Sequence, residues 1–206
     1  MTKNRLMSKR ITLGTADAAT ANLFKCLERD RELYEHCSRV SKFAVLIAEE
    51  MGLSAESQKE IQIAGLFHDV GKLSIPKEIL HKTILNTQEW EMIKTHSRLG
   101  KDILEKSKFL SKYSTWAHYH HERFDGGGYP EGLEGEEIPI EARIISVADC
   151  LDAMISHRPY RKNSFSIIET VHEIKSLAGS KYDPQITEAL EKLCNQKLAS
   201  ILFCLF

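Results

Sequence analysis

The sequence is poor in the cysteine patterns that build disulfide frameworks or thiolate metal sites. It contains five cysteines, an odd number, and no two of them form a C-x-x-C pair. We therefore do not expect a disulfide scaffold, and a reducing cytoplasmic compartment fits this composition.

The chain also lacks an excess of charge and a long hydrophobic run. Its formal net charge is −1 over 206 residues, so no general positive field attracts DNA, RNA or an anionic membrane. No apolar segment of a secretory signal follows the basic N-terminal stretch. The apolar ending LASILFCLF is far shorter than the ~20 residues that span a bilayer, and we expect it to pack on the domain or to form a homodimer contact.

What is present is helical periodicity. The content of 42% hydrophobic and 28% charged residues suits one globular domain. Apolar residues recur at spacings of three and four, and no segment is a convincing strand. We expect an all-α bundle in which residues 28–193 form the domain, residues 1–27 a short extension with one helix, and residues 194–206 an apolar C-terminal tail. The expected helices span residues 30–51, 54–67, 110–122, 141–157, 164–178 and 184–193, and a further one opens at Thr87 and carries His96 near its middle.

Histidines and carboxylates recur on or near these helices. Glu32 and His36 are four residues apart and therefore share one helix face. The other members are the doublet His68-Asp69, His96, the doublet His120-His121, and Asp149. If the helices bundle, this set suits iron, manganese or zinc. Eight ligands exceed the needs of one ion, so we expect two or three divalent metal ions, the usual machinery for attack on phosphate esters.

Each piece has an ordinary structural alternative. A Glu/His pair on a helix is often a solvated face, and His96 stands among Lys94, Ser97 and Arg98, as a surface residue would. Asp149 differs because it lies in the apolar run IISVADCLDAM, where an unpaired carboxylate is costly to bury. It needs a partner, and a metal ion is a suitable one.

Two strings resemble a known family. GLFHDVGK is similar to the His-Asp signature of the HD phosphohydrolase superfamily. HHERFDGGGYP, followed by IP, ARIISVAD and RPYR, resembles the HD-GYP subfamily of bacterial cyclic di-GMP phosphodiesterases. The resemblance implies an HD-domain helical bundle with a metal site in the bundle core and a loop that carries Gly128, Tyr129 and Pro130. It also implies hydrolysis of cyclic di-GMP to pGpG, and in some members to GMP, in second-messenger signalling.

The resemblance also assigns roles to residues. The implied ligands are His36, His68, Asp69, His96, His120, His121 and Asp149, with iron or manganese as the ions, and Glu32 matches the extra carboxylate of members that hold three metals. Asp69 and Lys72 are the expected catalytic residues, and Lys72 would hold a phosphate oxygen. Arg158 and Arg161 are expected to approach phosphate or guanine. Without the resemblance, Lys72 would be read as a surface lysine, and Arg158 and Arg161 would be read as arginines that cap a helix end.

Several expectations concern the loop and its partners. The two adjacent histidines, His120 and His121, are expected to diverge and to serve different metals. The family implies that the GYP loop also meets partner proteins, including cyclases with the GGDEF motif. About 25 residues precede the first ligand helix, which is too few for a receiver domain, so regulation is expected from expression, metal supply or a separate partner.

Two other functions stay open. The same centre would suit another cyclic dinucleotide, such as cyclic GMP-AMP, because no residue of the sequence is tied to the edges of the bases. The chain would otherwise be a non-catalytic scaffold that presents the loop to a partner. The complete ligand set argues against this last alternative.

Overall fold

The computed structural model describes residues 17–156 and 165–204, and these form helices joined by short loops. Within these ranges there is no strand, only two isolated bridges. The expected all-α class is confirmed. The α-helices are α1 (Ala18–Arg29), α2 (Arg31–Glu50), α3 (Ala55–Phe67), α4 (Lys77–Leu80), α5 (Thr87–Lys94), α6 (His96–Leu104), α7 (Ser114–Tyr119), α8 (Ile140–Ile155), α9 (Ile167–Ser176) and α10 (Pro184–Phe203), and 3-10 turns span Val70–Ser74, Ser111–Tyr113 and Gly135–Glu137.

Side-chain caps begin several helices where the sequence predicts them. The Asp30 carboxylate accepts from the N–H of Leu33 at the start of α2, and Ser54 accepts from Ser57 at the start of α3. Asp183 caps α10, whose first residue is Pro184. The predicted starts of these three helices are confirmed, because each depends on a local signal.

Two predicted helices are broken into shorter elements. The helix from Thr87 through His96 breaks at Thr95, whose hydroxyl donates to the carbonyl of Met92 in a tight turn. Asn86, not Thr87, caps α5, and α6 begins at His96. The helix expected over residues 110–122 is a 3-10 turn followed by α7, which ends at Tyr119. Both breaks move histidines from helix interiors to helix ends.

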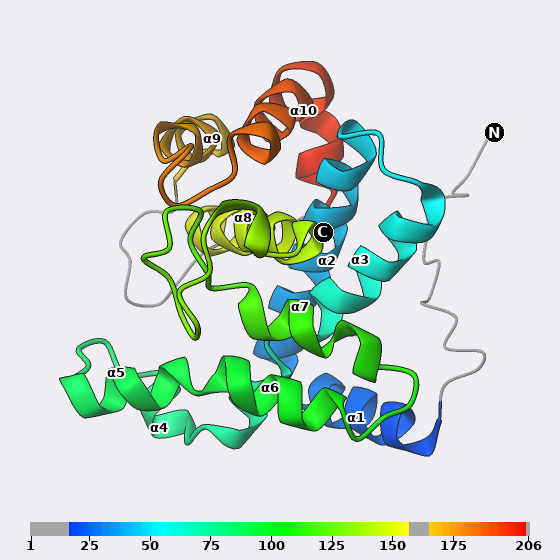
Figure 1. Cartoon of the computed structure of the whole chain (residues 1–206), viewed down its shortest axis with the longest axis vertical. Helices are drawn as coiled ribbons and strands as arrows, with labels where there is room; N and C mark the ends of the chain where they lie inside the picture. Colours follow the sequence, from blue (N-terminus) through cyan, green and yellow to red (C-terminus); the bar gives the residue numbers. More distant parts are fainter. Residues whose placement is uncertain (1–16, 157–164, 205–206) are drawn as a thin grey trace.

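The fold is built around α2, which packs along α3 and also contacts α8 and α10. In Figure 1, α9 and α10 lie at one end of the molecule, α4 to α6 lie at the other, and α2, α3, α7 and α8 fill the space between. The buried face of α2 carries Val40, Ala44 and Ile47, all inaccessible to solvent. His36 precedes Val40 by one turn on that face. The helix periodicity therefore directs His36 into the interior.

The C-terminal apolar residues belong to α10, which continues well beyond the predicted end at Leu193. The backbone of Lys197 departs from helical geometry, and the helix then continues to Phe203. Ile201 and Cys204 are buried in the hydrophobic core, and α10 packs on α2. In the described part of the chain, the ending thus packs on its own domain. None of the described helices combines the length and apolarity that a membrane crossing requires.

Candidate metal centre

Seven of the eight predicted ligands converge from five helices. His36 comes from α2, His68 and Asp69 follow α3, His96 begins α6, His120 and His121 follow α7, and Asp149 lies on α8. Their ligand atoms form three overlapping groups, in each of which all atoms lie within 4.8 Å of one another. The groups are Asp69 with His96, His120 and His121; His36 with His68 and Asp69; and His68 with His120 and Asp149. The arrangement is able to hold divalent metal ions.

Backbone carbonyls orient three of these imidazoles in the same way. The Nδ1 atom of His68 lies 2.8 Å from the carbonyl oxygen of Gly65, three residues earlier in the chain. His96 and His120 make the equivalent contact with Ile93 and Ala117, each at 2.6 Å. A carbonyl only accepts, so Nδ1 carries the hydrogen and Nε2 of the neutral ring carries a lone pair. Each lone pair faces the cluster, as metal binding requires.

Burial keeps four of the inward-facing histidines neutral. It lowers the pKa of His96 to about 4 and that of His120 to about 4, and it also lowers the pKa values of His68 and His121. Near neutral pH these rings therefore have free lone pairs. Deprotonated imidazole is the form that binds metal ions.

Asp69 lies at the middle of the cluster. One carboxylate oxygen, Oδ2, is 3.3 Å from Nε2 of His36, and the other, Oδ1, is 3.3 Å from Nε2 of His96. The side chain is 1% exposed and forms an ion pair with Lys72. Burial acts to raise the pKa of Asp69, but the charge of Lys72 and the neighbouring histidines lower it well below its usual range. Asp69 is therefore an anion that offers one oxygen to each side of the centre.

Two buried polar atoms show why the cluster fits a cation. Among the described residues, neither Nε2 of His68 nor Oδ1 of Asp69 has a hydrogen-bond partner. A nitrogen lone pair that faces a carboxylate oxygen is repelled unless positive charge lies between them. Hard and borderline divalent ions favour this donor set of imidazole and carboxylate.

His36 and Asp149 complete the side of the centre opposite His121. Nε2 of His36 lies 3.2 Å from Oδ1 of Asp149, and Nε2 of His68 lies 3.9 Å from the same oxygen. Burial acts to lower the pKa of His36, but hydrogen bonds to Asp149, Asp152 and Asp69 outweigh it and raise the pKa to about 10. We expected Asp149 to need a partner because it lies in an apolar run. His36 is part of that partner.

Sequence reasoning missed Asp152, which contacts Nδ1 of His36, the ring nitrogen that faces away from the cluster. Its Oδ2 atom lies 2.7 Å from Nδ1 of His36, and Arg39 reaches both of its oxygens. A signal was available in the sequence. Asp152 follows Asp149 by three residues on α8, and Arg39 follows His36 by three on α2, so each pair shares a helix face.

The structure does not bring Glu32 into the cluster. Its side chain is 74% exposed, and Oε2 lies 3.5 Å from Nε2 of His81. Glu32 is in the first turn of α2, where it lies one turn before His36. This first turn of α2 lies at the edge of the described bundle. The helix face that is buried at His36 is therefore exposed to solvent at Glu32. Glu32 as a ligand stays a prediction.

The rings of His120 and His121 lie close together, and the expectation that they serve different metals stays a prediction, because His120 also groups with His68 and Asp149. Their ring centroids are 3.9 Å apart, and both rings belong to the group of Asp69 and His96. Successive residues diverge by about 100° only inside a helix. Because α7 ends at Tyr119, that rule no longer applies, and both imidazoles reach the same region.

The GYP loop folds back onto His121. The ring of Tyr129 stacks on that imidazole with centroids 4.9 Å apart, and the N–H of Tyr129 donates to the carbonyl of His121 at 3.3 Å. A side chain at Gly128 would place Cβ only 2.3 Å from the backbone nitrogen of Arg123, so glycine is required there by close approach. Glu122, which the sequence did not single out, accepts from the N–H groups of Glu131 and Gly132. The loop and two of the candidate ligands thus form one packed unit.

Two predicted substrate-binding residues, Arg158 and Arg161, lie outside the described residues. Lys72 is partly exposed at the edge of the cluster, with 27% of its side chain accessible. Burial acts to lower its pKa, whereas the charges of Asp69 and Asp149 raise it. Lys72 is therefore a cation that borders both the candidate ligands and solvent.

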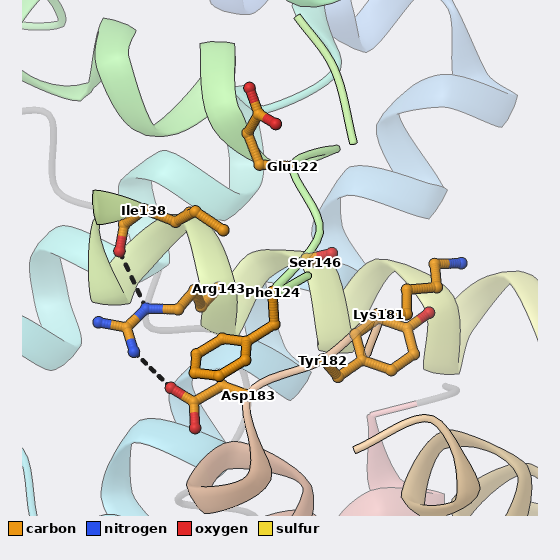
Figure 2. A pocket seen from close by; sticks show the side chains of 8 residues that line it. All are labelled: Glu122, Phe124, Ile138, Arg143, Ser146, Lys181, Tyr182 and Asp183. Atoms are coloured by element: carbon orange, nitrogen blue, oxygen red, sulfur yellow. Dashed lines mark hydrogen bonds and ion pairs between the residues drawn. The ribbon is translucent and has the colours of Figure 1, made fainter. Parts of the chain in front are cut away.

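A small pocket lies beside the loop, away from the candidate ligands. Its lining consists of Glu122, Phe124, Ile138, Arg143, Ser146, Lys181, Tyr182 and Asp183. Figure 2 shows Arg143 between the carbonyl of Ile138 and the carboxylate of Asp183, which it joins by hydrogen bonds. The empty space of about 180 Å³ is below the roughly 300 to 1,000 Å³ of small-molecule sites. Arg143 joins the start of α8 to Asp183, the cap of α10. We therefore do not consider this pocket a candidate substrate site.

Comparisons with known proteins agree with this geometry. A family model described as HD domain matches residues 22–186. The chain is 46% identical to a cyclic di-GMP phosphodiesterase of Thermotoga maritima, with 80% of this chain and 45% of the relative covered. It is 37% identical to 3'3'-cGAMP-specific phosphodiesterase 1 of Vibrio cholerae, with 79% and 38% covered. The chain spans about half the length, or less, of these curated relatives.

Solved structures show the same fold. A cyclic GMP-AMP specific phosphodiesterase of V. cholerae, V-cGAP3, superposes with a TM-score of 0.64 at 22% sequence identity. The match covers 82% of this chain and 45% of that one. At this identity the likeness establishes the helical architecture alone.

Proposed function

The chain belongs to the HD domain family, in its HD-GYP branch, and we propose that it is a metal-dependent phosphodiesterase that hydrolyses cyclic di-GMP. The observation that carries the proposal is the convergence of five histidines and two aspartates on one region, with histidine Nε2 atoms turned inward. The 46% identical relative named for this activity supports the substrate.

We assign two metal positions to the three overlapping groups. His36, His68, Asp69 and Asp149 would hold one ion, and Asp69, His96, His120 and His121 would hold the other. Iron or manganese suits this mixture of imidazole and carboxylate. Such ions lower the pKa of a water molecule and offset negative charge on a phosphate. A third ion, which would involve Glu32, stays a prediction from the sequence.

The residues of the chain would divide the remaining work. Asp69 would serve both positions, because one of its oxygens faces His36 and the other faces His96. Lys72 has a charged end that borders solvent and would hold a non-bridging phosphate oxygen as charge develops there. Water adds its oxygen to phosphorus, the bond to the ribose 3′ oxygen breaks, and that oxygen takes a proton. The product is linear pGpG, and a second cut would give GMP.

The setting of this reaction is part of the proposal. We place the reaction in the bacterial cytoplasm, where a cyclic dinucleotide is a second messenger. Arg158 and Arg161 would contact phosphate or guanine, and the loop of Gly128, Tyr129 and Pro130 would be the contact surface for a GGDEF-type partner. Homodimer formation is a further expectation from the apolar C-terminal residues, although the described ones pack on α2.

A second substrate has specific support. Relatives of this chain in V. cholerae carry names specific for 3'3'-cGAMP, and one of them is 37% identical. The metal centre acts on the phosphodiester that both dinucleotides share. Discrimination would depend on contacts with the bases.

Turnover of both substrates tests the proposal. The chain would be purified without oxygen, loaded with Fe²⁺ or Mn²⁺, and supplied in parallel with cyclic di-GMP and 3'3'-cGAMP, with products separated by chromatography. The Asp69→Asn variant is the control for contaminating enzymes. Faster conversion of cyclic di-GMP supports the proposal, and GMP as end product supports a third ion. Faster conversion of 3'3'-cGAMP would favour the second substrate, and no conversion by metal-loaded protein would contradict both.

A further inference from the structure

His36 differs from the other oriented histidines in the partner of its outer nitrogen. Three cluster imidazoles donate from Nδ1 to a backbone carbonyl three residues earlier. His36 instead donates from Nδ1 to the carboxylate of Asp152, at 2.7 Å. A carboxylate partner fixes the tautomer and the ring orientation, and it increases the basicity of the inner nitrogen. The ring of His36 is therefore held by a side chain, whereas the rings of His68, His96 and His120 are held by the backbone.

Asp152 has no oxygen left for a metal ion. Its Oδ1 atom accepts from Nε of Arg39 at 2.6 Å and from the hydroxyl of Ser156 at 3.2 Å. Its Oδ2 atom accepts from His36 and, at 3.1 Å, from the terminal nitrogen of Arg39. The side chain is fully buried. Asp152 therefore acts on the centre only through His36.

Two residues of α8 contact the two ring nitrogens of His36, which lies on α2. Asp149 and Asp152 are three residues apart on α8, and they lie at opposite ends of the same imidazole. Arg39, one turn after His36, completes the pairing on the outer side. The outer carboxylate is paired with a cation, and the inner one faces the cluster.

We propose that Asp152 is a positioning residue that orients the ring of His36 and keeps a hydrogen on Nδ1, so that Nε2 is turned to the centre and metal binding at the His36 and Asp149 position depends on Asp152. Binding at the position of His96, His120 and His121 does not. This inference rests on the metal centre of the proposed function. Loss of such an outer partner lowers metal affinity about 10-fold to 100-fold.

Orientation of His36 requires a carboxylate at position 152, and a neutral side chain of the same shape would not replace it. In Asp152→Asn, the amide oxygen would stay with Nε of Arg39, the closer of the two arginine contacts. The amide NH₂ would then face Nδ1 of His36 and would donate to it. His36 would be forced to carry its hydrogen on Nε2, where it cannot bind metal. An aspartate-to-asparagine change behind a catalytic histidine acts in the same way in serine proteases.

The experiment counts metal positions separately. Metal-free full-length protein would be titrated with Mn²⁺ at neutral pH, and free Mn²⁺ would be followed by electron paramagnetic resonance. The variants are Asp152→Asn, Arg39→Gln, and Asp102→Asn as a matched change at an exposed carboxylate. We expect wild type and Asp102→Asn to bind two ions. We expect Asp152→Asn to bind one ion about 10-fold to 100-fold more weakly, with the other unchanged.

Arg39→Gln separates positioning from a merely structural ion pair. It removes the cation but leaves the Asp152 carboxylate on His36, so we expect both ions to bind as in wild type. Equal loss of one ion in Arg39→Gln and Asp152→Asn would overturn the inference, as would unchanged binding in Asp152→Asn. Circular dichroism checks the fold of each variant, and loss of both ions by folded Asp152→Asn would also overturn the inference. Failure of wild type to bind Mn²⁺ would overturn the metal centre itself.

Discussion

The Nε2 atom of His121 lies 3.1 Å from the Nε2 atom of His96. Because Nδ1 of His96 donates to the carbonyl of Ile93, its Nε2 carries a lone pair in the neutral ring. Nε2 of His120 lies 3.5 Å from the same atom and is oriented in the same way. His96, His120 and a carboxylate oxygen of Asp69 therefore direct electron pairs at one region, and Nε2 of His121 lies in the same region, which is the arrangement of a metal position.

Removal of Asp149 should abolish metal binding and turnover together. Asp149 faces both His36 and His68, and α8 offers no second carboxylate on the inner side of His36. We expect Asp149→Ala to lose at least one equivalent of metal and about 100-fold or more of turnover. Metal analysis by mass spectrometry and a product assay on the same sample would check this. Full activity and metal content in Asp149→Ala would contradict the proposed site.

Removal of Lys72 should separate catalysis from metal binding. The lysine pairs with Asp69 but contributes no electron pair to the centre. We expect Lys72→Met to keep its metal and to lose about 100-fold to 1,000-fold in kcat, the usual cost of one group that stabilises charge in the transition state. Lys108→Met, a change at an exposed lysine, is the control. A large loss of metal in Lys72→Met would instead indicate a structural role.

Arg158→Ala should weaken substrate binding and leave the metal in place. This prediction comes from the RPYR motif, because Arg158 lies outside the described residues. Loss of a guanidinium that binds phosphate or stacks on guanine raises KM. Steady-state kinetics with metal analysis would check it. Unchanged KM would remove Arg158 from the proposed substrate site.

Two glycines that lie against each other should respond differently to alanine. A Cβ at Gly71 would lie 1.9 Å from the carbonyl oxygen of His96, whereas one at Gly100 would make ordinary contacts of 3.5 Å and more. We expect Gly71→Ala to cost about 1 to 3 kcal/mol in unfolding free energy. Gly100→Ala, inside α6, should be neutral or stabilising by up to about 1 kcal/mol. Denaturant unfolding of both variants checks the pair, and equal losses would mean that contact with His96 is not the cause.

Metal removal should lower thermal stability. An ion that binds only the folded chain stabilises it by about 2.7 kcal/mol at a concentration of 100 times its Kd. We therefore expect a chelator to lower the Tm and Mn²⁺ to restore it. Asp69→Asn should shift little with either treatment, because it lacks the central carboxylate. An identical Tm with chelator and with Mn²⁺ in wild type would show that no folded-state metal site exists.

Local signals made much of the fold predictable. Ser54 and Asp183 cap their helices as expected because a cap depends only on its own turn, and the helix expected from residue 30 begins after the cap Asp30. The break at Thr95 was not predictable from the apolar pattern, which continues through it. At the break, the Thr95 hydroxyl donates to the Met92 carbonyl, and the backbone of His96 lies close to Gly71, a tertiary contact that the sequence does not display.

The candidate site was predictable where motifs name residues and less so where geometry decides. Five of the seven converging ligands stand in GLFHDVGK, HHERFDGGGYP and ARIISVAD, and the family resemblance supplies His36 and His96. Asp152, by contrast, looks like one more acid in an apolar run until α2 and α8 are placed together. Helix spacing put Glu32 beside His36 correctly, yet spacing does not tell where a bundle ends and solvent begins. Likewise, the shared direction of His120 and His121 depends on the end of α7 at Tyr119.

The most direct test of the metal-dependent phosphodiesterase is turnover of cyclic di-GMP by one preparation before and after metal is removed and restored. We expect no pGpG from the chelated protein and renewed production of pGpG once Fe²⁺ or Mn²⁺ is returned. The Asp69→Asn variant should stay inactive throughout. Equal turnover in the chelated and reloaded protein would contradict a metal centre, and no turnover in reloaded protein with two bound ions would contradict the proposed substrate.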